Sequence, residues 1–485
     1  MRGASSSHVA AAHRIGQMAR DYMDGVITRV VVDYDPNTSL GPTHESQGSD
    51  MGLFTGLMGW DVTDSRMTEA RSHLEQSGVD VDIRILNYGA THENTYRLTV
   101  ANEIEEMTLY AISIGGGMME ITEINGVKVS MFGDYHETIL FTDDDNLAGG
   151  IDADHVIKRN GAFQIKSQAP LDLDDDLNWK DMKPVLPIGA RKDLTVPFVN
   201  SLEMLEYNKG RDLSFWELAL KYESARGNIS ESDVFEKMRV IVRILETSIQ
   251  SGIKGTQYED RMYGAQAPLY KERMGANKGM NLGLQDDVIL AVTALMDVKS
   301  SMGVIVAAPT AGSCGTLPGT CLGVANALGL DEDLKVKAML SAGLIGVFIA
   351  HMATFSAELG GCQAETGSGS GMAAAALVTL FDGNVDQCIS AASFAFQNTF
   401  GLVCDPVANR VEAPCLGKNV LMAGNALSAA NMILAGFDAL IPLDEVIVAM
   451  HKVGQAIPCE LRCTGKGGLA MTPTAQKIFA DLEKG

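Results

Sequence analysis

The chain has 485 residues, which is long for a single hydrophobic core and favours two or three domains. Its 61 acidic and 38 basic residues give a formal net charge of −23, so the surface repels phosphate backbones and anionic lipids. The composition therefore argues against a nucleic acid or a membrane as a partner.

The first eight residues, Met1 to His8, contain no apolar run of the kind that a signal peptide needs. The most apolar stretch, residues 339–350, is shorter than a membrane-spanning helix, and we interpret it as part of a buried helix. These features predict a cytoplasmic protein. Its eight cysteines are then expected to be reduced, and to be either structural or metal-binding.

Residues 1–142 alternate between helix and strand patterns and predict an α+β domain with a largely antiparallel sheet. Helical periodicity covers residues 10–24 and 67–76. Asn125-Gly126 is a strong hairpin signal between two of the strand patterns. The expected strands are residues 26–34, 81–86, 96–101, 109–114, 118–124, 127–132 and 138–141.

Two runs of aspartate, at 143–145 and 174–176, lie in the next part of the chain. They predict that residues 143–198 are an acidic linker or a reduced regulatory segment. Over residues 199–485 the strand signal largely disappears, and apolar periodicity predicts an all-helical domain with some helices enclosed by others. The expected helices are residues 234–251, 285–300, 334–357, 372–381, 385–400, 423–435 and 443–456.

Polar segments interrupt this helical pattern. Residues 308–316 place hydroxyls before a helix expected near 317–328, where free N–H groups favour an anion such as a carboxylate, or where Thr310 or Ser313 caps the helix. Residues 361–371 form a glycine-rich loop that precedes the next helix. The glycines allow close approach to a ligand or close packing of helices.

Cys404 and Cys415 are separated by ten residues that include two prolines. This spacing matches neither a zinc ribbon nor a ferredoxin motif, and it indicates a soft metal site. Together with Cys362, three thiols without a fourth would describe an iron–sulfur cluster with one open iron. The other cysteines are expected in the core (Cys321, Cys388) or are ambiguous (Cys314, Cys459, Cys463).

Histidines give a weaker signal. His8 follows three serines that either cap the next helix or, with the imidazole, bind a carboxylate. His44 and His92 lie in polar segments typical of the surface. His351 interrupts an apolar helix and is more commonly a core histidine than a site residue.

These segments together resemble the iron–sulfur-dependent L-serine dehydratases (L-serine ammonia-lyases), and the resemblance covers nearly the whole chain. The motifs similar to those of the family are residues 307–315, 361–365, 401–407 and 414–419 in the helical part, and residues 5–8, 14–16 and 113–117 in the N-terminal part. The chain resembles a fusion of the family's β and α domains, with residues 143–198 in place of a small regulatory domain or linker.

The resemblance implies a [4Fe–4S] cluster held by Cys362, Cys404 and Cys415. Its unligated iron would act as a Lewis acid on a small amino-acid substrate, which loses its β-substituent and, for L-serine, becomes pyruvate and ammonia without pyridoxal phosphate. His8 and His44 are the candidate bases, and Lys418 is a weaker one. We expect a homodimer.

The resemblance also implies that the substrate is held across the domain interface. The residues expected to bind it are Ser5, Ser6, Ser7, Thr310, Gly312, Ser313, Gln363, Glu365 and Asn419.

The sequence departs from the family pattern beside these motifs. Gln47 stands where the family has a histidine in a Gly-His-Gly-Thr-Asp context. Residues 261–266 replace a Ser-Gly-Leu-x-Gly-Gly-Asp motif. Residues 351–352, 409–410 and 417–418 also differ from the pattern. Because the cysteines remain, we interpret this as a retained cluster with an altered substrate pocket.

Several substrates and roles therefore stay open. L-serine is the leading substrate, and threonine, cysteine or a larger β-hydroxy or β-thio amino acid is the alternative; Arg410 would suit an additional acidic group. A non-catalytic iron–sulfur or amino-acid sensor is the second hypothesis. A structural metal protein is the weakest, because a structural zinc site closes with four protein ligands.

Overall fold

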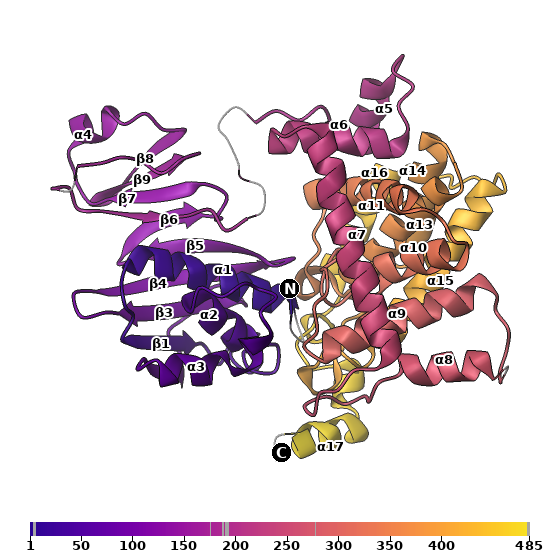
Figure 1. Ribbon diagram of the computed structural model, residues 1–485, viewed down its shortest axis with the longest axis horizontal. Coiled ribbons are helices and arrows are strands. Elements are labelled where there is room, and N and C mark those ends of the chain that lie inside the picture. The colour runs from indigo at the N-terminus through magenta and orange to yellow at the C-terminus, as the bar shows by residue number, and fades with distance from the viewer. Residues whose placement is uncertain (3–5, 175, 187–188, 190–193, 277, 483–485) are drawn as a thin grey trace. The chain divides into compact units, whose positions relative to one another are not determined.

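The computed structural model describes residues 1–2, 6–174, 176–186, 189, 194–276 and 278–482. They divide into two compact units (Figure 1). One unit is Ser7–Leu194, and the other is Thr195–Gly485 together with Met1–Ser6. Each unit has its own large hydrophobic core, so the folds can be explained separately.

The N-terminal unit contains two sheets. The first has strand order β2-β1-β3-β4-β5-β6 and the second β10-β7-β9-β8. The strands are β1 (Arg29–Tyr34), β2 (Asp80–Ile85), β3 (Thr95–Ala101), β4 (Glu106–Gly115), β5 (Met118–Ile124), β6 (Val127–Met131), β7 (His136–Leu140), β8 (His155–Arg159), β9 (Ala162–Ser167) and β10 (Trp179–Met182). The helices are α1 (Ser6–Met23), α2 (Ser49–Leu57), η1 (Ser65–Glu69), α3 (Ala70–Gln76) and α4 (Asp145–Gly149).

The six-stranded sheet confirms the first six predicted strands, and the seventh, residues 138–141, is β7 of the second sheet. The predicted antiparallel pairing of the first sheet is confirmed with one exception. β1 and β2 are parallel, because α2, η1 and α3 connect them and return the chain in the same direction. Asn125 and Gly126 both adopt positive φ at the β5–β6 hairpin, as the turn signal predicts. α1 packs against α2 so closely that a Cβ on Gly56 would lie 2.1 Å from the carbonyl oxygen of His13.

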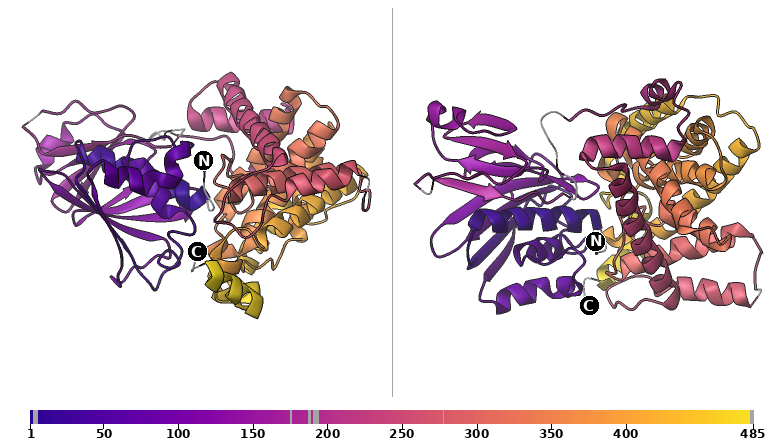
Figure 2. Two further views of the ribbon diagram at one scale, coloured as in Figure 1. Left: turned by 60° about the horizontal axis from the view of Figure 1, so that its bottom comes forward. Right: turned by 45° about the horizontal axis from the view of Figure 1, so that its top comes forward.

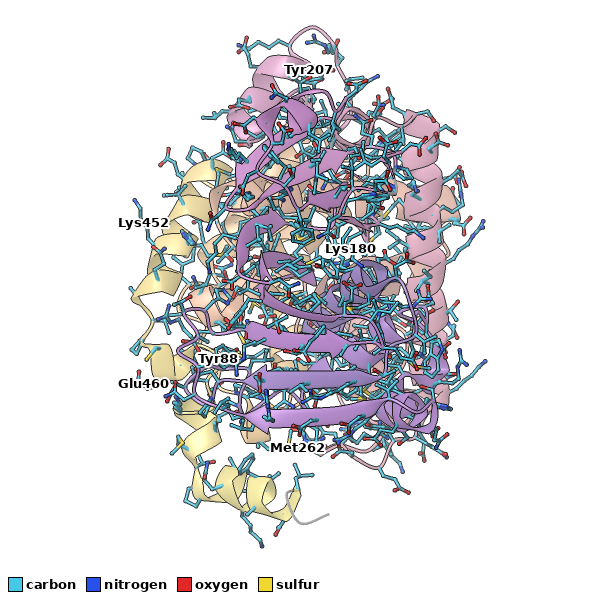
Figure 3. All side chains as sticks on the ribbon, turned by 90° about the vertical axis from the view of Figure 1, so that its left-hand side faces the viewer. Tyr88, Lys180, Tyr207, Met262, Lys452 and Glu460 are labelled. Carbon is cyan, nitrogen blue, oxygen red and sulfur yellow. The ribbon has the colours of Figure 1, made fainter. Side chains whose placement is uncertain are left out.

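Residues 143–198 contribute α4, β8, β9 and β10; β9 and β10 pair with β7 in the second sheet, and β8 pairs with β9. Glu137 on β7 is fully buried there, where Lys166 and Gln164 of β9 donate hydrogen bonds to its carboxylate. Lys180 of β10 is labelled in Figure 3 and pairs with Glu105 of the N-terminal unit. The acidic segment is therefore structured over much of its length.

The second unit is mostly helical, which confirms the predicted change from mixed helix and strand to helix along the chain. Its helices are α5 (Ser201–Asn208), α6 (Phe215–Gly227), α7 (Glu231–Lys254), α8 (Ala267–Gly275), α9 (Leu284–Ser300), α10 (Thr316–Ala327), α11 (Glu332–Met352), α12 (Ala357–Gly360), α13 (Ser368–Leu380), α14 (Val385–Gln397), α15 (Cys415–Leu434), α16 (Leu443–Ala456) and α17 (Pro473–Leu482). Short turns of helix are η2 (Gln363–Gly367), η3 (Val407–Asn409), η4 (Cys459–Leu461) and η5 (Gly468–Met471).

α13 is the central helix of this unit, and every one of its residues is buried. It packs against α10, α11, α14 and α15, so it is an enclosed helix of the kind that the apolar pattern predicts. Figure 1 labels these helices, and Figure 2 shows the same ribbon from two further sides. The glycine-rich segment 361–371 was expected to be a loop, and that expectation is wrong. It forms the π-helical turn η2 and the start of α13, because glycine lets neighbouring helices approach closely.

α11 is longer than the apolar run at residues 339–350 suggests. Among the residues that the structure describes, it is the one helix with the length and apolarity to cross a membrane, and 61% of its most apolar window is buried inside the unit. α11 packs against α6, α7 and α13, as a core helix does.

Candidate metal and substrate site

Three separate segments of the helical unit bring the predicted cysteine ligands together. Cys362 precedes η2, Cys404 follows α14, and Cys415 is the first residue of α15. All three are buried. Ligand atoms of Cys362, Cys404 and Glu365 lie within 4.8 Å of one another, and Cys415 interacts electrostatically with Cys362 and Glu365. The arrangement is a compact sulfur-rich site with a carboxylate at its edge.

The environment raises the pKa of two of these thiols, Cys404 and Cys415. The pKa of Cys404 is raised well above its usual value, first because its thiol interacts with those of Cys362 and Cys463, and then because it is buried. Burial likewise raises the pKa of Cys415. A metal centre here must displace the thiol protons, so metal binding and proton release are coupled.

Lys418, one turn into α15, supplies the cation of the site. Its ammonium group donates to the carbonyl oxygen of Val403 at 2.6 Å and to Oδ1 of Asp405 at 2.7 Å, and it lies 3.9 Å from Sγ of Cys362. Burial lowers the pKa of Lys418, but Cys362 and Asp405 raise it overall. The ammonium has three donors and three partners, an arrangement suited to stabilising negative charge beside the sulfur atoms.

Glu365 connects the cysteine cluster to the hydroxyl-rich segment before α10. Oε1 of Glu365 accepts a hydrogen bond of 2.7 Å from Oγ1 of Thr310, which also contacts Oγ of Ser313 at 3.0 Å. A Cβ on Gly312 would lie 2.8 Å from this carboxylate, so only glycine leaves room for it. Burial and the nearby charge of Glu358 raise the pKa of Glu365 to about 7. Thr310, Gly312, Ser313 and Glu365 therefore surround one polar position.

Two predicted substrate-binding residues are instead fully occupied by the protein. Asn419 is completely buried, donates to the carbonyl oxygens of Gly312 and Cys415, both at 2.8 Å, and accepts from the backbone and hydroxyl of Thr316. Gln363 donates to the carbonyl oxygen of Met450 and accepts from the backbone N–H of Gly401. Through these hydrogen bonds, both side chains hold the segments around the site together.

The segment between Cys404 and Cys415 is clamped to residues 260–263. Oε2 of Glu412 accepts from the N–H groups of Met262 and Tyr263, both at 3.0 Å, and Arg410 donates to the backbone and carboxylate of Asp260. Met262 is labelled in Figure 3. The two segments that contain the differences from the family pattern at residues 261–266 and 409–410 thus lie against each other. Arg410 already has an acidic partner, which does not favour the expected contact with an acidic substrate group.

In the N-terminal unit, His44 belongs to a buried hydrogen-bonded group. Its Nδ1 lies 2.7 Å from Oδ2 of Asp50, and the other carboxylate oxygen of Asp50 accepts a 2.8 Å hydrogen bond from Tyr34. The rings of Tyr34 and His44 stack with centroids 4.4 Å apart. When Nδ1 donates to Asp50, Nε2 is left as a proton acceptor. Gln47 follows His44 by three residues and is buried. Its Oε1 has no hydrogen-bond partner among the described residues.

The other N-terminal candidates lie at the start of α1. Ser5 is outside the described residues; Ser6 begins the helix, Ser7 follows it half-buried, and His8 is buried. Arg14, nearly two turns further on, donates to the carbonyl oxygen of Gly117. The family motifs at residues 14–16 and 113–117 therefore meet within this unit.

Sequence reasoning missed several groups at these sites. Asp405, Glu412 and Asp50 anchor Lys418, residues 262–263 and His44, respectively. Asp405 directly follows Cys404, which is a local signal, whereas the partners of Glu412 and Asp50 depend on tertiary contacts. Cys463 lies against Cys362 and Cys404, whereas Cys314, Cys321 and Cys388 are core residues.

Comparison with known proteins agrees with this geometry. A family model described as "Serine dehydratase alpha chain" matches residues 210–470. The chain is 38% identical over 281 residues to a "Probable L-serine dehydratase, alpha chain" of Bacillus subtilis, covering 58% of this chain and 94% of that protein. It is 35% identical to the "L-serine dehydratase, alpha chain" of Peptoniphilus asaccharolyticus, covering 58% and 97%. It is 25% identical to the "L-serine dehydratase" of Helicobacter pylori, covering 97% and 96%.

Proposed function

Because the chain belongs to the serine dehydratase family, we propose that it is a [4Fe–4S]-dependent lyase that converts L-serine to pyruvate and ammonia. The observation that carries the proposal is the convergence of Cys362, Cys404 and Cys415 beside Glu365 in the family-matched part of the chain. The names of the relatives support the dehydration of serine, and the buried thiols support the cofactor.

The donor set suits an iron–sulfur cluster. Cys362, Cys404 and Cys415 offer soft thiolate ligands, and Lys418 offsets the negative charge of a thiolate-bound centre. When bound, the cluster supplies a Lewis acid that polarises the carboxylate and β-hydroxyl of the substrate.

The protein's own groups provide the polar surroundings of the reaction. Thr310 and Ser313 place two hydroxyls beside Glu365, and Glu365 can exchange a proton with the departing hydroxyl, since its pKa lies at about 7. Overall, a base takes the α-proton, the hydroxyl leaves as water, and the resulting enamine hydrolyses to pyruvate and ammonia. Lys418 serves better as a fixed cation than as this base, since all its donors are engaged.

His44 is the best-prepared proton acceptor of the three predicted bases. Asp50 orients its imidazole, as a carboxylate behind a catalytic histidine does. His8 stays the second candidate. The ordered His44–Asp50–Tyr34 group favours an enzyme over a non-catalytic sensor, even though Gln47 replaces the family's histidine.

The test is anaerobic reconstitution of the full chain followed by a substrate panel without pyridoxal phosphate. We expect about four irons per chain, ammonia release fastest from L-serine, and slower or no release from threonine and cysteine. His44→Gln is expected to lower kcat at least about 100-fold at unchanged iron content, as the loss of a general base does. His73→Gln, which removes a half-buried histidine from the middle of α3, is the matched control.

An iron-free protein with full lyase activity would refute the cofactor. Turnover of another amino acid faster than L-serine would reassign the substrate. Iron uptake without turnover of any amino acid tested would leave the sensor as the better description.

A further inference from the structure

Cys463 is a fourth cysteine beside the candidate metal site, and the mechanism above does not use it. It belongs to the segment after η4, which runs alongside the residues around Cys404. The N–H of Cys404 donates to the carbonyl oxygen of Leu461, and the N–H of Cys463 donates to the carbonyl oxygen of Cys404, both at 2.8 Å. Two backbone hydrogen bonds therefore fix Cys463 against Cys404.

The side chains of the two residues are also in contact. Cys463 packs against the small cluster that contains Cys362 and Cys404, and its thiol interacts directly with that of Cys404. The bridge partner of Cys404 is Arg462, and Cys463 is the next residue along the chain. The backbone hydrogen bond and the side-chain packing thus both bring the two cysteines together.

Cys463 differs from its neighbours in accessibility. Cys362, Cys404 and Cys415 are buried, whereas Cys463 is partly exposed. Thiol–disulfide exchange begins at a thiol that the reagent can reach and is completed by a second thiol in contact with the first. Cys463 is the reachable thiol here, and Cys404 is its contacting neighbour.

The backbone of Cys463 supports a specific role. Its φ of 62° lies in the left-handed region, which is unfavourable for a residue other than glycine. Such conformations collect at functional positions, where the surrounding structure holds them in place. The hydrogen bond to Cys404 is part of that surrounding structure.

We propose that Cys404 and Cys463 form a reversible disulfide in the metal-free protein, which withholds Cys404 from the metal site until the bond is reduced. A small-molecule disulfide such as oxidised glutathione is the oxidant. The thiolate of Cys463 attacks it and releases one reduced thiol; the thiolate of Cys404 then attacks Cys463 and releases the second. One protein disulfide forms, two protons leave the protein, and the oxidant gains two electrons as two thiolates.

The evidence for the disulfide is the contact between the two cysteines. Its effect on metal loading rests on the proposed function, because it assumes that Cys404 is a metal ligand. Reaction mapping in metal-free protein separates these questions, because it does not depend on lyase activity. If the disulfide forms but the reduced protein takes up no iron, the proposed function fails and the disulfide does not.

The experiment treats the metal-free full chain with oxidised glutathione under argon, alkylates the remaining thiols and maps the cross-linked peptides by mass spectrometry. We expect a Cys404–Cys463 cross-link, loss of two of the eight free thiols, and recovery of both with dithiothreitol. Iron uptake after this treatment is expected to fall at least about tenfold and to return after reduction.

Two single variants make the result specific. Cys463→Ser is expected to form no cross-link and to take up iron equally well with and without the oxidant. Cys459→Ser, which removes the exposed cysteine four residues earlier, is expected to behave as the unmodified chain does. A cross-link between Cys362 and Cys404, or a stable glutathione adduct at Cys463, would overturn the proposal.

Discussion

At the scale of single residues, the charge balance around the sulfur atoms is the main determinant of the site. Lys418 and Asp405 form a pair whose side chains are 15% and 7% exposed, so neither charge is well solvated. Removing one partner of such a pair leaves the other uncompensated, which is more damaging than removing a surface charge. Asp405 also accepts from the backbone of Leu469, so the pair connects three segments.

Lys418→Met is therefore expected to destabilise the helical unit by about 3–5 kcal/mol and to reduce iron retention during gel filtration. The control is Lys452→Met on α16, where the side chain is exposed (Figure 3); it is expected to change neither property. Lys418→Arg keeps the positive charge and should retain more iron than Lys418→Met. Equal iron retention in all three variants would contradict the role assigned to Lys418.

At the scale of elements, close packing of α13 positions Cys362 and Glu365. A Cβ on Gly371 would lie 2.1 Å from the ring of Phe396 on α14, so this helix contact depends on glycine. The π-helical turn η2 continues directly into α13, and the site residues on η2 are fixed by the packing of the helix that follows. A disturbance of α13 is thus transmitted to the site.

Gly371→Ala is expected to lower stability by about 1–3 kcal/mol, since the added methyl group overpacks the contact with Phe396. Gly343→Ala on α11 is the matched control. No atom lies within 4 Å of a Cβ built there, so we expect a small gain in stability from the better helix former. Thermal unfolding of both variants measures the difference, and a stabilising Gly371→Ala would show that α14 moves freely.

The second sheet carries a pH-dependent element of its own. Burial raises the pKa of Glu137 to about 7, although Lys166 opposes the shift. The folded state therefore holds this proton more tightly than the unfolded chain does, so stability of the sheet is highest at low pH and falls as pH rises toward about 7. Glu137→Gln should remove this fall.

Hydrogen exchange of β7 and β9, corrected for the intrinsic effect of pH, measures this prediction between about pH 5 and pH 8. Glu106→Gln is the control, because the Glu106 side chain is 56% exposed. An unchanged pH dependence in Glu137→Gln would mean that another group titrates.

At the scale of the whole molecule, the two units have separate cores, and the predicted metal ligands lie in one of them. A ligand that binds only the folded state stabilises the unit that holds it. The three cysteines come from distant parts of the helical unit's sequence, so a bound centre cross-links those parts. The homodimer stays a prediction, which light scattering tests. A regulatory role for residues 143–198 also stays a prediction, which ligand screening tests.

Removal of the iron should therefore increase hydrogen exchange in residues 401–418 and 459–468, and leave β1, β3 and β4 unchanged. The comparison uses the same full chain before and after chelation, analysed by mass spectrometry. Equal exchange throughout would show that the cysteines do not hold the metal.

The sequence by itself determined the fold classes of both parts and the family, because periodicity, turn residues and short motifs are local; the three cysteine ligands stay its prediction. Its indication of a loop at residues 361–371 is wrong, since glycine promotes flexibility in isolation but close helix packing in a core. Only the tertiary structure decided that Asn419 and Gln363 bond to other groups of the protein, that His44 is held by Asp50, and that Cys463 packs against Cys404. Those assignments depend on contacts between residues far apart in the chain, and no local pattern records which distant group fills a hydrogen bond.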